Sequence, residues 1–207
     1  MNWLSRLIRY VVKFSAFITF AVLFFIIAYI LARGIPYLKP SLFALEYTTE
    51  NVSLLPAIIT TLIMTVLALL ISAPIGIFTG FYLVEYAKSG NKLVEIIRIT
   101  TETLSGIPSI VYGLFGLLFF VTTLGWGFSI IAGAFTLAIM ILPLIIRSTE
   151  EALLAVPDLL REASYGLGAG KLRTIFRIVL PSAMPGILAG IILAIGRIVG
   201  ETAALIY

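Results

Sequence analysis

The 207-residue sequence contains no cysteine and no histidine. It therefore lacks the residues for disulfides, for zinc sites built on thiolate or imidazole, and for catalysis by a Ser/His or Cys/His pair. Charge is scarce too, because only 12% of the residues are Asp, Glu, Lys or Arg, against about 25% in soluble domains. An enzyme is accordingly the least favoured function class.

What the sequence has in abundance is apolar side chains, at 61% of residues with a mean hydropathy of +1.15. A helix needs about 20 apolar residues to cross a bilayer core. Five stretches are long enough: 14–32, 55–84, 103–124, 128–146 and one from 182 toward the C-terminus. Because backbone groups in lipid must pair within their own segment, each stretch is predicted to be a helix. The fold class is therefore all-α: one polytopic membrane bundle over residues 1–207, with five spans.

Two of these stretches need a further remark. The first begins with basic residues as a signal peptide does, but its apolar run is longer than a signal core, so we expect a retained helix. The second exceeds the thickness of a bilayer core, so it must tilt, project from the core or bend, and Pro74 and Gly76 are the natural place for a bend.

The basic residues are distributed unevenly between the segments that connect the spans. Of the 14 Lys and Arg residues, only Arg33 and Lys39 fall on one side if the spans alternate, and Arg197 lies within a span. The positive-inside rule assigns the other eleven to the cytoplasm: Arg6, Arg9, Lys13, Lys88, Lys92, Arg98, Arg147, Arg161, Lys171, Arg173 and Arg177. We therefore expect a multi-pass membrane protein with a cytoplasmic N-terminus and an external loop at 33–54.

The largest polar connection covers residues 147–181, which the charge pattern places in the cytoplasm. Ser148 with Glu151 fits a capping box that would start a short helix. Pro157 would end that helix and begin a second one. On this second helix an apolar face is expected to point away from Arg161 and Glu162; it consists of Leu159, Leu160, Ala163 and Leu167.

A turn and a third amphipathic piece follow this helix. Gly168 and Gly170 permit a sharp turn, and Pro181 is expected to open the next span. The apolar residues of the third piece are Leu172, Ile175, Phe176 and Val179. Such an elbow offers an apolar ridge with charged flanks, which fits either docking of a cytoplasmic partner or a connector lying on the membrane surface.

The stretch GLGAGKLR, residues 166–173, superficially resembles a phosphate-binding loop. The strict pattern G-x-x-x-x-G-K-[ST] would need a glycine where Tyr165 stands and a hydroxyl where Leu172 stands. Two required parts are missing, so we expect no nucleotide, metal or other cofactor on this chain.

The spacing around this elbow matches a family signature. Binding-protein-dependent ABC importers carry E-A-A-x₃-G-x₉-I-x-L-P in their membrane subunits, and this chain resembles that pattern with one small-for-small departure, Ser164 for the second Ala. The matching residues are Glu162, Ala163, Ser164, Gly168, Ile178, Leu180 and Pro181. The resemblance implies that the elbow is a coupling element docked on a separate ATPase subunit, which would hold the ATP and Mg²⁺.

Two charged residues lie in the last span. Arg197 and Glu201 are four residues apart, so they would share a face of a continuous helix. They fit either a mutual ion pair of structural purpose or an anion path, because a charge within a membrane is costly and a guanidinium suits an oxyanion. Gly196 and Gly200 would keep this stretch slim enough for close approach to a neighbour.

The segment SGIPS, residues 105–109, disturbs regular helix at the inner start of the third span. Ser105, Gly106 and Pro108 are candidate gate residues, although a proline in a first turn is also typical of an ordinary helix start. We expect the serines of this segment to satisfy the backbone groups freed there. Aromatic interface anchors are expected at Tyr37, Tyr112 and Trp126.

Residues 102–116 and 200–205 are similar to the permeases of the phosphate-specific branch of these importers, closer to the PstA type than to the PstC type. The resemblance implies an inner-membrane protein with a second homologous permease of PstC type, two ATPase subunits, an external phosphate-binding protein and membrane lipid as partners, and no nucleic acid. Such permeases have six spans, so the sixth span is expected to be missing from a chain that stops at Tyr207.

Three other functions remain open from the residues alone. The chain could serve another oxyanion such as sulfate or molybdate. It could be a carrier or channel that needs no ATPase. It could also be an assembly or sensing subunit that does not transport.

Overall fold

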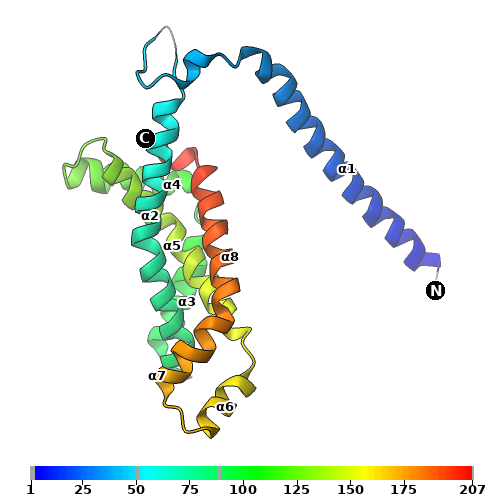
Figure 1. The fold of residues 1–207 in the computed structure, drawn as a ribbon, viewed down its shortest axis with the longest axis vertical. Helices are drawn as coiled ribbons and strands as arrows, with labels where there is room; N and C mark the ends of the chain where they lie inside the picture. The colour runs from blue at the N-terminus through cyan, green and yellow to red at the C-terminus, as the bar shows by residue number, and fades with distance from the viewer. Residues whose placement is uncertain (1–2, 50–51, 88–89, 207) are drawn as a thin grey trace. The chain divides into compact units, whose positions relative to one another are not determined.

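The computed structural model describes residues 3–49, 52–87 and 90–206, so Lys88, assigned above to the cytoplasm, lies outside the described residues. The described residues form helices and no β-strand, which confirms the predicted all-α class. The chain divides into two compact units, residues 1–58 and 59–207, and each is considered by itself (Figure 1).

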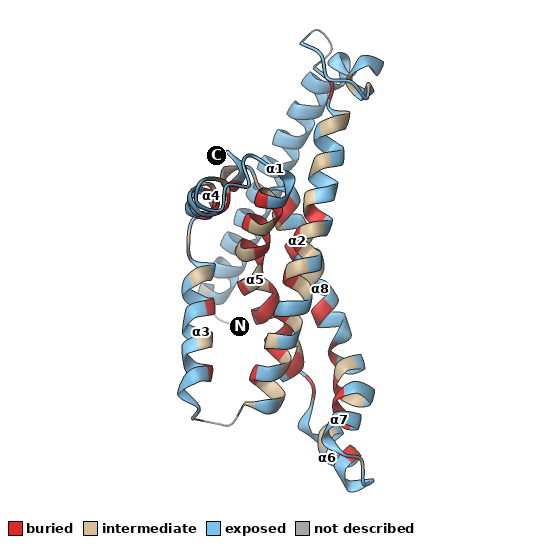
Figure 2. Ribbon diagram, turned by 90° about the vertical axis from the view of Figure 1, so that its left-hand side faces the viewer, coloured by how far each residue is buried: buried red, intermediate tan, exposed pale blue. Residues whose placement is uncertain are grey.

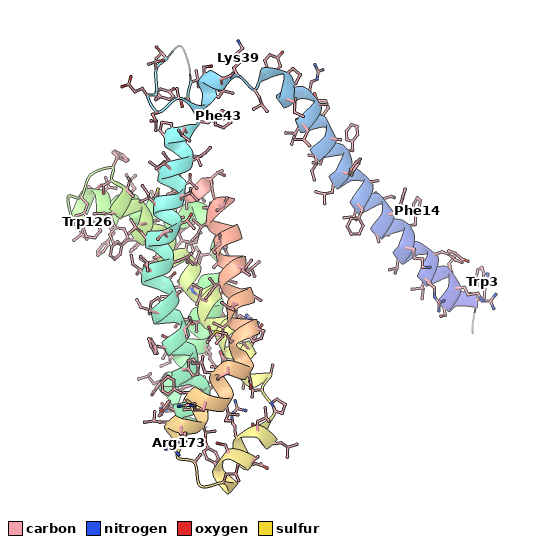
Figure 3. The ribbon with its side chains drawn as sticks, in the orientation of Figure 1. Trp3, Phe14, Lys39, Phe43, Trp126 and Arg173 are labelled. Carbon is pink, nitrogen blue, oxygen red and sulfur yellow. The ribbon has the colours of Figure 1, made fainter. Side chains whose placement is uncertain are left out.

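The first unit holds one long helix and a short loop region. Its elements are α1 (Trp3–Gly34), η1 (Ile35–Tyr37) and η2 (Pro40–Phe43). The predicted span 14–32 lies inside α1, and every residue of α1 whose burial is described is exposed. Side chains accordingly project around this helix, Trp3 and Phe14 among them (Figure 3). In the loop, the hydroxyl of Ser53 donates a hydrogen bond to the carbonyl of Leu42 at 3.1 Å.

Helix α2 runs across the boundary between the units, and all later elements belong to the second unit. In chain order they are α2 (Leu55–Phe81), η3 (Tyr82–Tyr86), α3 (Lys92–Ser105), α4 (Ser109–Gly116), η4 (Leu117–Thr123), α5 (Ile130–Leu154), α6 (Asp158–Gly166), α7 (Lys171–Thr174), η5 (Ile175–Val179), α8 (Leu180–Val199) and η6 (Ala203–Leu205). The elements η3, η4 and η5 are π-helical, whereas η6 is a 3₁₀ turn.

Four helical runs are long and apolar enough to cross a membrane, and the number reaches the predicted five only if a bent pair counts as one span. The predicted disturbance of regular helix at residues 105–109 is present, since α3 and the run 109–123 meet at an angle of 101° within the predicted third span, 103–124. The reason is local. Pro108 has no N–H and disfavours helical geometry in the residue before it, so α3 ends at Ser105 and α4 begins at Ser109.

One prediction about 147–181 needs correction and another is confirmed in part. Ser148 and Glu151 start no helix, because α5 continues through both of them to Leu154. Pro181 lies in the first turn of α8, as predicted, but the helical run that contains α8 already begins at Lys171. A π-helical turn directly before the proline accounts for this, because such turns re-satisfy carbonyl groups that a proline leaves unpaired in membrane helices.

Helix α2 passes through Pro74 and Gly76, the natural place for a bend, as a single α-helix. Its buried side consists of small residues at intervals of four, namely Ala68, Ser72, Gly76 and Gly80. A Cβ on Gly76 would lie 2.7 Å from Ile145, and one on Gly80 would lie 2.7 Å from Thr149. The glycines therefore serve close approach of α2 to α5, as small residues do between membrane helices.

Helix α5 is the centre of the second unit, and Figure 2 shows its buried residues facing the neighbouring helices. Leu137, Ile141, Ile145 and Leu153 are almost fully buried. Arg98 on α3 forms an ion pair of 2.7 Å with Glu150 on α5. The cytoplasm-assigned ends of α3 and α5 are thus held together.

The contact between α5 and α8 also relies on small residues. A Cβ added to Gly186 would lie 2.7 Å from the Cβ of Ala152, and one added to Gly190 would lie 2.6 Å from the Cβ of Ser148. Each helix thus presents two small residues four positions apart, the arrangement that lets membrane helices pack at short distance.

Candidate functional site

The elbow between α6 and α7 is formed as the sequence predicts at Gly168 but not at Gly170. Gly168 has φ +79°, a left-handed conformation that a side chain disfavours. Its N–H donates to the carbonyl of Tyr165 at 2.9 Å, and the N–H of Ala169 donates to that of Ser164 at 3.1 Å, which is the Schellman motif. Gly170 is extended with φ −72°, so the turn does not require glycine there.

The signature residues lie on both limbs of this elbow. Glu162 and Ala163 are exposed on α6, whereas Ser164 is buried and its hydroxyl lies 2.8 Å from that of Thr174 on α7. The single departure from the family pattern thus supplies a hydrogen bond that joins the two limbs. Of the remaining signature residues, Ile178 and Leu180 are half-buried and Pro181 is exposed.

The apolar ridge is present, although its composition differs from the prediction. Leu159 is 74% exposed and Leu167 is 90% exposed. Leu172 and Phe176 are exposed on the second limb, whereas Ile175 and Val179 are turned inward against the bundle. The elbow therefore offers leucine side chains from both limbs to a partner. Arg173 marks its position at the lower end of the molecule in Figure 3.

Arg161 does not belong to the solvent-facing flank expected for it, because its side chain is only 14% exposed. Its Nε and Nη2 donate to the carboxylate of Glu85 at 3.1 and 3.0 Å. Nη1 donates to the carbonyl of Val156 at 2.8 Å and to Asp158 at 3.0 Å. Nη2 also donates to the carbonyl of Leu153 at 3.0 Å.

The other limb reaches the same place. The ammonium of Lys171 donates to the backbone carbonyl of Glu85 and lies 4.6 Å from the centre of the Tyr86 ring, a cation–π contact. Glu85 itself is only 6% exposed at its side chain. Both limbs of the elbow are therefore attached to the end of the helical run that begins with α2.

At the opposite end of α8, Arg197 and Glu201 do not form the ion pair that was one of the two possibilities left open by the sequence. The helix ends at Val199 with Gly200 as its cap, so the two side chains are no longer one helical turn apart. Glu201 instead accepts hydrogen bonds from the N–H groups of Ala203 and Ala204 at 3.0 and 3.1 Å. Within residues 3–49, 52–87 and 90–206, the half-buried Arg197 has no hydrogen-bond or ion-pair partner.

The candidate gate at Ser105, Gly106 and Pro108 coincides with the sharp bend between α3 and α4. The serines, however, do not form hydrogen bonds with the backbone groups that the bend leaves free. Ser105 donates back to Thr101 within α3 at 2.7 Å. The Tyr112 hydroxyl instead donates to the carbonyl of Leu104 at 2.7 Å, across the bend. Tyr112 is only 5% exposed, so it is a buried residue rather than an interface anchor.

The two other predicted anchors differ from Tyr112. Trp126 stacks on Phe120 with ring centres 5.3 Å apart and remains partly exposed, and Tyr37 is exposed. Their location at a membrane interface stays a prediction.

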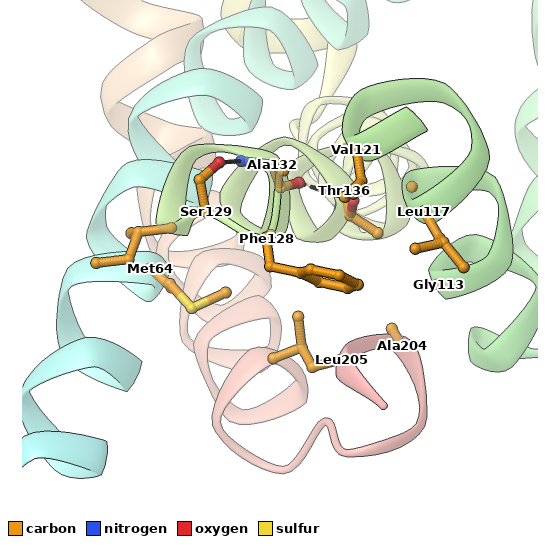
Figure 4. Close-up of a pocket in the computed structure, with 13 residues that line it drawn as sticks. Met64, Gly113, Leu117, Val121, Phe128, Ser129, Ala132, Thr136, Ala204 and Leu205 are labelled. Carbon is orange, nitrogen blue, oxygen red and sulfur yellow. Dashed lines mark hydrogen bonds between the residues drawn. The ribbon is translucent and has the colours of Figure 1, made fainter. Parts of the chain in front are cut away.

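A cavity of about 270 Å³ lies between α4, α5 and η6. Figure 4 shows the Phe128 ring lying across it, with Leu205 and Met64 nearby. Its described lining residues carry no charged side chain. The Thr136 hydroxyl donates a hydrogen bond to the carbonyl of Ala132 at 2.8 Å, so its proton is not available to a ligand. This cavity therefore suits apolar groups and offers little to an oxyanion.

Sequence reasoning missed the roles of Arg161, Glu85, Lys171, Thr174 and Tyr112. Arg161 and Glu85 are 76 positions apart, and no local pattern relates residues at that separation. The Tyr112 contact had a weak signal: an aromatic hydroxyl four residues after a helix-breaking proline, close to the carbonyl groups that the break frees.

Comparison with known proteins places this architecture in a family. Residues 72–207 match the model of the family described as binding-protein-dependent transport system inner membrane component. A probable ABC transporter permease protein, YqgI of Bacillus subtilis, is 46% identical over 141 residues, covering 68% of this chain and 48% of that protein. The phosphate transport system permease protein PstA 1 of Mycobacterium tuberculosis is 46% identical over 143 residues, covering 69% and 46% respectively. The chain thus spans about half the length of these relatives.

A solved structure shares the fold. A chain of the MetNI methionine ABC transporter in an inward-facing conformation superposes with a TM-score of 0.57 at 23% identity, over 71% of this chain and 68% of that one. With the family match over residues 72–207, these findings show that the chain belongs to the binding-protein-dependent transport system inner membrane components.

Proposed function

We propose that this chain acts as a membrane-spanning permease subunit of an ATP-driven phosphate importer. Its elbow docks a separate ATPase subunit, which carries the ATP and Mg²⁺, and the membrane helices form part of an anion path. The assembly contains a second homologous permease of PstC type, two ATPase subunits and an external phosphate-binding protein. The N-terminus and the elbow lie in the cytoplasm, because most of the basic residues are on that side.

The observation that carries the proposal is the geometry of the elbow. The signature spacing coincides with a Schellman turn at Gly168, and Leu159 and Leu167 are presented to solvent on one rigid unit. Exposed leucines on a well-ordered turn are poorly explained by a simple connector, whereas they suit insertion into a groove on another protein. Phosphate as the substrate is supported by relatives that are named phosphate transport permeases.

Arg197 supports an anion path. It lies in the last turn of α8 and has no acidic partner among the described residues. A guanidinium without a counter-ion in a membrane protein is costly unless a ligand or another subunit neutralises it. Five N–H donors in a planar fork suit the oxygens of phosphate. Glu201 lies beside it in sequence and holds η6 in place.

The docking role is tested by substitutions in the elbow of the assembled transporter. Gly168→Pro is expected to destroy the turn, because proline cannot adopt φ +79° and lacks the N–H that binds Tyr165. Glu162→Lys reverses an exposed charge and should leave the membrane fold intact. Both should reduce co-purification of the ATPase and phosphate uptake. Glu95→Lys, an exposed reversal on α3, is the matched control. Normal ATP-driven uptake in both elbow variants would refute the docking role.

The anion path is tested by Arg197→Gln, with Lys39→Gln as a control that removes a cation outside the last span. We expect phosphate uptake to be abolished in the first variant while the ATPase still co-purifies. Glu201→Gln keeps an oxygen that can accept the hydrogen bonds of η6 but removes the negative charge. It therefore separates the structural role of this side chain from an electrostatic role in the anion path. Undiminished uptake in Arg197→Gln would favour a structural role for the arginine.

The choice of substrate is tested by competition. Radiolabelled phosphate uptake into proteoliposomes should be inhibited by unlabelled phosphate and not by sulfate or molybdate. Inhibition by sulfate or molybdate would assign another oxyanion, and uptake without ATP would assign a carrier or channel.

A further inference from the structure

The elbow is joined to three membrane helices, and only one of these links is purely non-covalent. Helix α5 leads directly into α6 through residues 155–157, and α7 continues without a break into α8. Helix α2 is more than 70 residues away in sequence from α6, and polar contact between them depends on one residue pair, Arg161 with Glu85. Any movement of the elbow is transmitted to α5 and α8 through the polypeptide chain itself. Transmission to α2 depends instead on non-covalent contacts between α2 and the elbow.

The hydrogen bonds of Arg161 suit it to connect the elbow to α2. All five N–H groups of a guanidinium can donate, and here each has an acceptor: the Glu85 carboxylate receives two, and the others go to Asp158 and to the carbonyls of Leu153 and Val156. A planar fork with every donor used has one orientation, so this side chain behaves as a rigid connector between the ends of α2 and α5.

The contacts close a triangle. The first limb holds α2 through Arg161 and Glu85, and the second limb holds it through Lys171 and the carbonyl of Glu85. The third side is the hydrogen bond of 2.8 Å between Ser164 and Thr174, which joins the limbs to each other. Because three sides are fixed, the elbow and the end of η3 move as one body rather than sliding past each other.

We propose that Arg161 and Glu85 form an anchor that transmits movement of the elbow to α2, so that Arg161 is a positioning residue for coupling rather than for ATPase docking. The inference rests on the function proposed above. Apolar residues of the α2 run, Ile77, Phe81 and Val84, also pack against the cluster that contains Val179, but such packing is non-directional. The charged fork supplies the direction that apolar contact lacks.

The experiment uses the complete transporter with its partner subunits in proteoliposomes, and it measures phosphate transported per ATP hydrolysed. Arg161→Gln and Glu85→Gln should lower this ratio by roughly tenfold, while ATP hydrolysis persists and the ATPase still co-purifies. Arg161→Lys keeps the charge but not the fork, so it should restore part of the ratio. The matched control is Arg147→Gln, which removes an exposed arginine whose ion pair with Glu151 stays within α5.

The natural absence of cysteine permits a direct rescue. Glu85→Cys combined with Arg161→Cys should be uncoupled, and a bifunctional thiol cross-linker that bridges the two positions should restore the transport ratio. Failure of the cross-link to restore it, an unchanged ratio in Arg161→Gln, or loss of the ATPase from that variant would each overturn the anchor. A wild-type complex that holds no ATPase or carries no phosphate would instead overturn the proposed function, so the two failures are distinct.

Discussion

The contact between α5 and α8 allows a quantitative prediction about Gly186. A Cβ at this position would lie 2.7 Å from the Cβ of Ala152 and 3.4 Å from its Cα. Carbon atoms pack best at about 3.5–4.0 Å, so Gly186→Ala produces an overlap of roughly 1 Å with a methyl group that cannot rotate away. Both atoms are attached directly to helical backbone, and relief therefore requires the helices to separate.

The expected cost follows from this overlap. Overpacking of a well-packed core costs typically about 1–3 kcal/mol, and alanine regains up to ~1 kcal/mol of helix propensity relative to glycine. We therefore expect Gly186→Ala to lower the free energy of unfolding by up to about 2 kcal/mol. Gly196→Ala is the matched control on the same helix, because a Cβ there would meet nothing within 4 Å. It should be neutral or slightly stabilising.

A double-mutant cycle isolates the contact. Ala152→Gly removes the methyl group that Gly186→Ala would strike, and by itself it should cost about 1 kcal/mol in helix propensity. When both changes are combined, the overlap disappears and the propensity effects cancel, so the double variant should be more stable than the sum of the single effects by the overlap cost of about 1–3 kcal/mol. The free energies are measured by reversible unfolding in mixed micelles, followed by circular dichroism. Additive effects of the two substitutions would refute the close contact of these helices.

Three other substitutions test single features of the fold. Gly168→Ala places a side chain at φ +79°, which costs about 1–2 kcal/mol. The unfolding temperature in detergent should fall by about 2–8 °C, and under the proposed function ATPase co-purification should fall several-fold. An unchanged unfolding temperature would contradict the left-handed turn. Tyr112→Phe leaves the carbonyl of Leu104 without its donor, so stability should fall by about 1–3 kcal/mol, as measured by thermal unfolding. Thr149 has a buried hydroxyl with no partner in the described part of the chain; Thr149→Val should therefore be neutral or stabilising by up to about 1 kcal/mol, and marked destabilisation would reveal a hidden partner.

The sequence predicted the membrane helices well and their ends poorly, for one physical reason. Composition decides that a segment lies in lipid, and lipid requires helix, so α1, α2, α5 and α8 follow from apolar length alone. The ends of helices in soluble proteins are marked by caps and prolines. In this chain Pro74, Pro143 and Pro185 all lie inside helices, and the Ser148 cap signal lies within α5. Among the described helices proline marks a break at Pro108, between α3 and α4, and at Pro157, between α5 and α6, where the predicted break is confirmed.

In the candidate site, features that depend on neighbouring residues could be predicted from the sequence, whereas contacts between distant residues could not. The turn at Gly168 was predictable because a left-handed residue after an amphipathic helix is a local property of the sequence. The proposed anchor was not, because Arg161 and Glu85 meet only after α2 and α5 have packed. Spacing also failed where it assumed a continuous helix: the four-residue interval between Arg197 and Glu201 has no meaning once α8 ends at Val199.

Arg161 and Arg197 differ in their hydrogen-bond partners, a difference that the sequence alone does not reveal. Arg161 lies next to a signature residue and has every donor satisfied within the chain. Such a side chain has no N–H donor left for a ligand, which favours the proposed anchoring role. Arg197 has no partner among the described residues, and its donors remain for an anion or for another subunit. Under the proposed function, substitution of Arg161 should therefore lower the phosphate transported per ATP, whereas substitution of Arg197 should abolish phosphate uptake.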